Sequence, residues 1–195
     1  ELASVHDVRP FAPHNVANAL AAAALARAHG VDAAAVREGL RAFEPAGHRI
    51  TDVGRVDGVR YVDDSKATNA HAAETSLRGY EPVVWVAGGL AKGQRFDDLV
   101  EAVAPRLRAV VLLGADRSVF RDALARHAPD VPVVEVERTD TGAMDDVVSA
   151  AHGLARPGDT VLLAPGCASW DMFVDYAHRG DVFAAAVAAL PGEHS

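Results

Sequence analysis

The sequence has a single cysteine, few aromatic residues and no long apolar run. Cys167 has no partner for an internal disulfide, which is typical of proteins in a reducing compartment. The longest apolar stretches, around residues 20–26 and 182–190, are too short and too rich in alanine to span a bilayer. We therefore expect a cytoplasmic protein that is not embedded in a membrane.

Positive charge is also in short supply. The chain has 19 lysine and arginine residues against 27 aspartate and glutamate residues, which gives a formal net charge of −8 at pH 7. This sign disfavours binding to a polyphosphate backbone or to an anionic membrane surface. The composition therefore excludes nucleic acid and membrane lipid from the expected partners.

The 195 residues suffice for one ordinary domain and part of another. A hairpin is predicted over residues 50–62, because two alternating segments flank the turn-forming pair Asp57-Gly58. Four short runs rich in valine and leucine follow, each succeeded by a helical stretch: residues 83–87, 109–113, 131–136 and 160–164. Such alternation predicts an α/β, Rossmann-like fold, with a mostly parallel sheet and helices on both faces.

The first part of the chain has a different pattern. A helix is predicted over residues 15–29 and a second over residues 32–43, with Gly30 ending the first and Asp32 capping the second. Residues 44–47, Glu-Pro-Ala-Gly, have the composition of a linker. We therefore expect a domain boundary there, with residues 1–47 on one side and 48–195 on the other.

Ligands of open parallel sheets bind beyond the carboxyl ends of the strands, so polar residues in the loops that follow the apolar runs are candidates for a binding site. Residues 63–69, Asp-Asp-Ser-Lys-Ala-Thr-Asn, form the first such loop. One interpretation is a turn followed by a helix N-cap, since Asp, Ser, Thr and Asn all cap backbone donors. In the other, Asp64 and Lys66 present an anion and a cation to one ligand.

Residues 88–93, Gly-Gly-Leu-Ala-Lys-Gly, form the second loop. It lacks the Gly-Lys-Ser/Thr ending of a Walker loop, so it is either a tight strand-to-helix turn or a place where backbone approaches a ligand. In the second case Lys92 supplies a point charge for a carboxylate or a phosphate.

The third loop, residues 165–171, contains two possible nucleophiles, Cys167 and Ser169. No Gly-x-Ser-x-Gly elbow surrounds the serine, and a lone cysteine beside a strand is more often a small buried hydrophobe. We therefore expect Ser169 to bind a ligand rather than to attack one. His71 and Glu74 lack a third metal ligand nearby, so no zinc site is expected, and the missing Gly-x-Gly-x-x-Gly argues against a bound dinucleotide.

Four blocks together resemble the Mur ligases of peptidoglycan synthesis. They are His-Asn-x-x-Asn-x-x-Ala-Ala at residues 14–22, His48-Arg49, Asp-Ser-Lys-Ala-Thr-Asn at 64–69, and a segment from Cys-Ala-Ser-Trp-Asp at 167–171 to Arg-Gly at 179–180. The third block most resembles the members that add D-glutamate to UDP-N-acetylmuramoyl-L-alanine. Other Mur ligases and folylpolyglutamate synthetases typically have a Tyr-Ala-His-x-Pro segment there.

The resemblance implies roles for residues around ATP. Asn15 and Asn18 would contact the adenine side of the nucleotide, Arg49 its phosphates and Asp64 the ribose hydroxyls. Lys66 matches a lysine close to the reacting groups, which makes it the expected catalytic residue.

The resemblance also implies an amino-acid pocket. Lys92, Thr68 and Ser169 would surround the carboxylates of D-glutamate. Trp170 and Tyr176 are the other expected substrate-binding residues. They depart from the usual pattern of the family, since Trp170 stands where leucine is common and Tyr176 where phenylalanine is frequent.

In the reaction implied by the resemblance, ATP phosphorylates the alanyl carboxylate, and the amine of D-glutamate attacks the resulting acyl phosphate. Mg²⁺ bridges the phosphates. The phosphate loop, the magnesium ligands and the uridine-nucleotide domain of the family have no counterpart in this sequence. We therefore expect the tail of the central ATPase domain in residues 1–47 and the C-terminal domain in 48–195, together a monomer that is inactive alone.

Two alternatives remain open at this point. The chain can be a non-catalytic module that keeps the fold and binds an amino acid or a nucleotide, or part of a related ligase that uses L-glutamate. Stereochemistry depends on the placement of atoms to within about an ångström, which no motif specifies.

Overall fold

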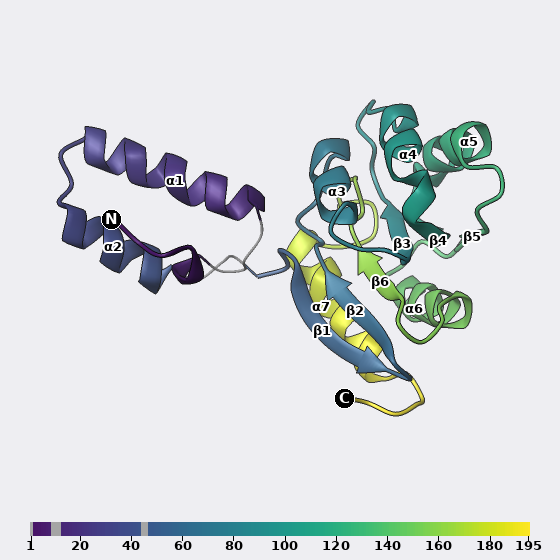
Figure 1. Cartoon of the computed structure of the whole chain (residues 1–195). Coiled ribbons are helices and arrows are strands. Elements are labelled where there is room, and N and C mark those ends of the chain that lie inside the picture. Colours follow the sequence, from purple (N-terminus) through teal and green to yellow (C-terminus); the bar gives the residue numbers. More distant parts are fainter. Residues whose placement is uncertain (1, 9–12, 44–46) are drawn as a thin grey trace. The chain divides into compact units, whose positions relative to one another are not determined.

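The structure, a computed structural model, describes residues 2–8, 13–43 and 47–195 (Figure 1). The chain divides into two compact units, Glu1–Ala46 and Gly47–Ser195, and each is described by itself. Among the described residues, no helix combines the length and the apolar character needed to cross a membrane.

The first unit consists of the short helix η1 (Val5–Asp7) and the helices α1 (Pro13–Ala28) and α2 (Ala33–Ala42). Both predicted long helices are confirmed. Asp32 caps α2, since its carboxylate accepts a 3.1 Å hydrogen bond from the backbone nitrogen of Ala34. Of the predicted linker, residues 44–46 lie outside the described residues.

The second unit is built on a six-stranded sheet in the order β1-β2-β6-β3-β4-β5. Only β1 and β2 pair antiparallel, and the remaining neighbours are parallel, which confirms the predicted sheet. The strands are β1 (Thr51–Val56), β2 (Val59–Asp63), β3 (Val83–Gly88), β4 (Leu107–Leu113), β5 (Val133–Glu135) and β6 (Thr160–Leu163).

Helices cover both faces of this sheet (Figure 1). The helices of the second unit are α3 (Ala70–Leu77), α4 (Asp97–Val103), the short η2 (Ala104–Arg106), α5 (Arg117–His127), α6 (Ala143–Leu154) and α7 (Tyr176–Ala188). Buried side chains of α3, α4 and α5 pack on one face, and those of α6 and α7 pack on the other.

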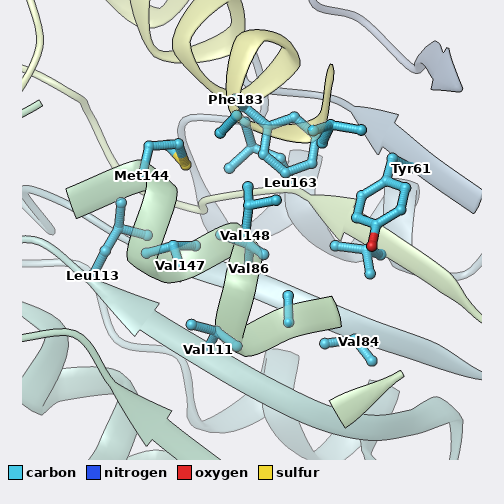
Figure 2. Packing of buried hydrophobic residues seen from close by; sticks show 14 of the residues in the cluster. Tyr61, Val84, Val86, Val111, Leu113, Met144, Val147, Val148, Leu163 and Phe183 are labelled. Atoms are coloured by element: carbon cyan, nitrogen blue, oxygen red, sulfur yellow. The ribbon is translucent and has the colours of Figure 1, made fainter. Parts of the chain in front are cut away.

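The central strand β3 is buried on both faces. Val84 and Val86 face the cluster that contains Phe183 of α7 (Figure 2), whereas Trp85 faces the opposite cluster. This alternation follows from the two-residue period of a strand, and it explains why the sequence of β3 is almost continuously apolar.

The parallel strands β2, β6, β3 and β4 end at one edge of the sheet, which we call the carboxyl edge. The loops that leave this edge are residues 64–69, 89–96, 114–116 and 164–175. The core therefore brings together segments that lie about 100 residues apart in the chain.

Candidate functional site

Backbone hydrogen bonds join the three predicted loops of the carboxyl edge to one another. The nitrogen of Gly166 donates to the oxygen of Ala67 at 2.8 Å. Leu90 and Ala168 exchange two hydrogen bonds, of 2.9 and 3.1 Å, as an isolated antiparallel bridge. The loops after β2, β3 and β6 thus form one continuous surface.

The two glycines that begin the second loop are needed for packing. Gly88 and Gly89 have φ angles of 119° and 129°, in the region that favours glycine. A Cβ atom on Gly88 would clash with the backbone oxygen of Leu113, and one on Gly89 with that of Ala168. Their conformation therefore serves the contact between neighbouring loops, and it does not by itself indicate a ligand.

A fourth loop, residues 114–116, supports this surface, although it was not among the loops predicted from the sequence. The backbone nitrogen of Ala91 donates to the carboxylate of Asp116 at 2.8 Å, and the nitrogen of Ala115 donates to the carboxylate of Asp171 at 2.8 Å. Its position in the sequence could have indicated it, because it directly follows the predicted parallel strand that ends at residue 113.

A buried arginine holds the first and third loops together. Arg179 of α7 is 1% exposed and donates to the backbone oxygens of Ser65 and Cys167, at 2.8 and 3.1 Å. Its Nε also donates to the hydroxyl of Ser65 at 2.9 Å, and that hydroxyl donates to the backbone oxygen of Tyr176 at 2.7 Å. Burial lowers the pKa of Arg179 to about 10, so the group stays protonated at neutral pH.

A histidine attaches the first residues of the second unit to the end of β2. Nδ1 of His48 lies 2.6 Å from a carboxylate oxygen of the buried Asp63. Gly180 leaves the room for this pair, because a Cβ atom there would clash with both side chains. In the sequence, His48 stands out only as part of a motif, and no pattern indicates Asp63 as its partner.

Asp64, the expected ribose contact, is 6% exposed. Burial raises the pKa of its carboxyl to about 6, and the neighbouring carboxylate of Asp63 acts in the same direction. The nearby hydroxyl of Ser76, the backbone of Ile50 and the guanidinium of Arg49 act in the opposite direction. Arg49, the expected phosphate contact, is exposed and close enough to influence this charge.

The chain contains only two lysines, and both lie in these loops. Nζ of Lys92 lies 3.9 Å from the centroid of the Trp170 ring, and Nζ of Lys66 lies 5.3 Å from the centroid of the Tyr176 ring. Both distances are within the range of cation–π attraction. Among the described residues, neither ammonium group forms an ion pair with a carboxylate.

The remaining predicted pocket residues lie on the same three loops. Ser169 is 2% exposed, directly before the exposed Trp170, and Thr68 is half-buried, directly before the N-cap Asn69 of α3. The asparagine side chain caps the helix by accepting from the nitrogen of Ala72 at 2.9 Å. The capping interpretation of this loop is therefore correct for Asn69, and it leaves Lys66 and Thr68 available to a ligand.

Asn15 and Asn18, the expected adenine contacts, belong to the first unit. They lie three residues apart on α1, which places them on the same side of the helix. Asn15 is 9% exposed and Asn18 is exposed. The structure thus keeps them together, in a different unit from Arg49 and Asp64.

Cys167 does not have the properties of a nucleophile. Its side chain is fully buried, and burial raises the pKa of the thiol to about 12. Only the thiolate is reactive, so attack by this sulfur is disfavoured at neutral pH. The structure supports the interpretation of Cys167 as a small buried hydrophobe.

The described residues contain no group of three or more His, Cys, Asp or Glu side chains that could hold a metal ion. Glu74, which the sequence pairs with His71, instead accepts two hydrogen bonds from Arg78, at 2.7 and 3.0 Å. This pairing leaves the carboxylate of Glu74 engaged by a guanidinium group and not by a metal site.

A family model matches most of the second unit. The family model described as "Mur ligase, glutamate ligase domain" matches residues 48–167, so the chain belongs to the Mur ligase family. Among its relatives is a UDP-N-acetylmuramoylalanine–D-glutamate ligase of Streptomyces coelicolor, which is 68% identical over 190 residues. A protein of the same name from Thermobifida fusca is 64% identical over 192 residues.

These alignments cover 97% and 98% of this chain, and 40% and 41% of the two relatives. The chain thus spans about 40% of the length of the curated relatives it matches. A solved structure of a murein peptide ligase from Psychrobacter arcticus superposes with a TM-score of 0.62. It covers 94% of this chain and 38% of the other at 18% identity, a likeness that shows the fold alone.

Proposed function

We propose that the chain is part of an ATP-dependent, amide-forming ligase that adds D-glutamate to UDP-N-acetylmuramoyl-L-alanine in the cytoplasm. The observation that carries the proposal is the position of both lysines on joined loops of the carboxyl edge, without an acidic partner among the described residues. The relatives that carry this activity in their names support it.

The acidic amino acid is assigned to Lys92, Thr68 and Ser169. A dicarboxylate needs donors that converge on its oxygens, and ammonium and hydroxyl groups supply them. The backbone bridge between Leu90 and Ala168 keeps the lysine-bearing loop beside the serine-bearing loop, which supports this grouping.

The nucleotide is assigned to Arg49 and Asp64 of the second unit and to Asn15 and Asn18 of the first. A guanidinium group suits phosphate oxygens, and an ionised carboxylate suits a ribose diol. The assignment of residues 1–47 to the tail of the ATPase domain, and of 48–195 to the C-terminal domain, is part of this proposal, as is action as a monomer.

Lys66 is proposed as the catalytic residue. Its ammonium group would stabilise the negative charge that develops when the amine of D-glutamate attacks the acyl phosphate. Lys92 and Ser169 would hold the amino acid so that its amine faces the acyl carbon, and such positioning supplies a large part of the rate.

Mg²⁺ is the metal that the family reaction implies. The described residues contain no group of three or more His, Cys, Asp or Glu side chains that could hold it. No step proposed for this chain therefore goes through the metal.

The test is an exchange ligase, in which this chain replaces the matching 190 residues of the Streptomyces coelicolor relative. We expect ADP release that requires both D-glutamate and UDP-N-acetylmuramoyl-L-alanine, and none from the 195-residue chain alone. Activity with L-glutamate instead would favour the related ligase. An exchange ligase that folds and binds D-glutamate without turnover would favour the binding module.

A further inference from the structure

Lysine is rare in this chain. Of its 19 lysine and arginine residues, two are lysines, and both lie over aromatic rings of the segment that follows β6. The closer contact joins Lys92 to Trp170, at 3.9 Å from nitrogen to ring centroid.

The backbone of Lys92 is held in place from two sides. Its φ angle of 51° lies in the left-handed region, and the turn around it is closed by a 3.0 Å hydrogen bond from the nitrogen of Gln94 to the oxygen of Ala91. The nitrogen of Ala91 is tied to Asp116, and the side chain of Gln94 accepts from the nitrogen of Ala70 at 3.1 Å. The four-carbon side chain of Lys92 is itself flexible, so its ammonium group needs a further contact to stay in one place.

An aromatic ring is suited to that task. A carboxylate partner would neutralise the lysine and compete with an acidic ligand, whereas a ring attracts the ammonium group through its face and leaves the charge intact. The N–H groups that point away from the ring remain free to donate. Trp170 is 65% exposed, so its ring does not belong to the core and contacts the lysine at the surface of the carboxyl edge.

We propose that Trp170 is a positioning residue that holds the ammonium group of Lys92 ready for a carboxylate of the amino-acid substrate. The other lysine, Lys66, lies over the ring of Tyr176 at the longer distance of 5.3 Å. The inference rests on the proposed function for the identity of the ligand. The contact between Lys92 and Trp170 can be tested without any ligand.

The contact is tested by reductive methylation of the 195-residue chain with ¹³C-formaldehyde, which keeps the lysine charge. Two lysine methyl signals are expected, assigned with Lys66→Arg and Lys92→Arg. Because the face of an indole ring shields nearby nuclei, we expect the Lys92 signal upfield of its value in the denatured chain. Trp170→Leu should remove this shift, and Trp170→Phe should retain part of it. Val174→Ala, at an exposed position of the same segment, should leave it unchanged.

An unshifted Lys92 signal, or one that Trp170→Leu does not move, would overturn the proposal. Replacing Trp170 does not open the core, so loss of the shift reports on the contact and not on unfolding.

The consequence for binding is tested in the exchange ligase. Trp170→Leu should raise the KM for D-glutamate about two- to fivefold, the range expected for an exposed cation–π contact, with kcat and the KM for ATP unchanged. Trp170→Phe should restore most of the affinity. An unchanged KM for D-glutamate would refute the positioning role. An exchange ligase without D-glutamate-dependent activity would refute the proposed function, and the methylation experiment would then decide separately whether Trp170 contacts Lys92.

Discussion

Arg179 donates a 2.8 Å hydrogen bond to the backbone oxygen of Ser65, 114 residues earlier in the chain. The same guanidinium group reaches the oxygen of Cys167 at 3.1 Å. The loop that bears Lys66 and the loop that bears Ser169 are therefore held by one buried cation. Their arrangement depends on α7 as much as on the sheet.

Replacing Arg179 with methionine should destabilise the chain. The change orphans two buried carbonyl oxygens and removes charge-assisted hydrogen bonds, so we expect the free energy of unfolding to fall by about 2–4 kcal/mol. Urea denaturation followed by circular dichroism measures it. Arg121→Met is the control, because its half-exposed side chain makes surface ion pairs and should cost about 0.5 kcal/mol or less. Equal losses for the two variants would contradict the role given to Arg179.

Asp64 should make stability depend on pH. Its folded pKa of about 6 lies above the unfolded value of 3.8, so between these values the folded state binds a proton that the unfolded state does not. The contribution of this group to the free energy of unfolding therefore decreases as the pH rises through that range. At pH 7.5, Asp64→Asn should be more stable than the original chain by about 1–3 kcal/mol.

The difference between the two proteins should shrink as the pH falls toward 4, because both then carry an uncharged side chain. Thermal or urea unfolding at a series of pH values between 4 and 7.5 measures it. A difference that is constant over this range would show that the pKa of Asp64 is not raised.

Gly180 should not tolerate alanine. A Cβ atom there would press on His48 and Asp63, so Gly180→Ala should lower the free energy of unfolding by about 1–3 kcal/mol. Gly153, in α6, is the matched control, since a Cβ atom there meets no heavy atom within 4 Å. Gly153→Ala should be neutral or stabilising by up to about 1 kcal/mol. Denaturant unfolding of both variants decides, and a neutral Gly180→Ala would contradict the packing described for His48.

Cys167 should resist alkylation in the folded chain. Burial of the thiol and its pKa of about 12 leave almost no accessible thiolate at pH 8. We expect iodoacetamide to modify the native chain at least roughly 100-fold more slowly than the chain in 6 M urea. Rapid modification of the native protein would reopen the possibility of a reactive cysteine.

The sheet was predictable from the sequence because its strands are short apolar runs with clear ends. Asp57-Gly58 marked the hairpin, and the all-buried β3 appeared as a continuous apolar segment. The prediction was less accurate at the sheet edge, where residues 131–136 were expected to be extended and β5 covers only Val133–Glu135. The length of an edge strand depends on how far it pairs with its single neighbour, here β4. The apolar run alone does not specify that length.

The contacts that organise the site were not predictable in this way. His48 and Asp63 meet across a hairpin, and Asp116 reaches a loop 25 residues earlier. Neither pair has a sequence signature, because each depends on how different strands align in the sheet and bring their following loops to the same edge. The loops and several candidate residues followed from the sequence, and the family resemblance supplied the individual roles. The structure adds the hydrogen bonds that hold the loops together.

The division of the site between amino acid and nucleotide is tested most directly by steady-state kinetics of the exchange ligase with Lys92→Ala and Asp64→Ala. We predict that the lysine variant raises the KM for D-glutamate at least about tenfold, as loss of a charge-assisted contact implies, and leaves the KM for ATP unchanged. The aspartate variant should raise the KM for ATP and not that for D-glutamate. An unchanged KM for D-glutamate in Lys92→Ala, or equal effects of both variants on one substrate, would contradict the proposed division of the site between amino acid and nucleotide.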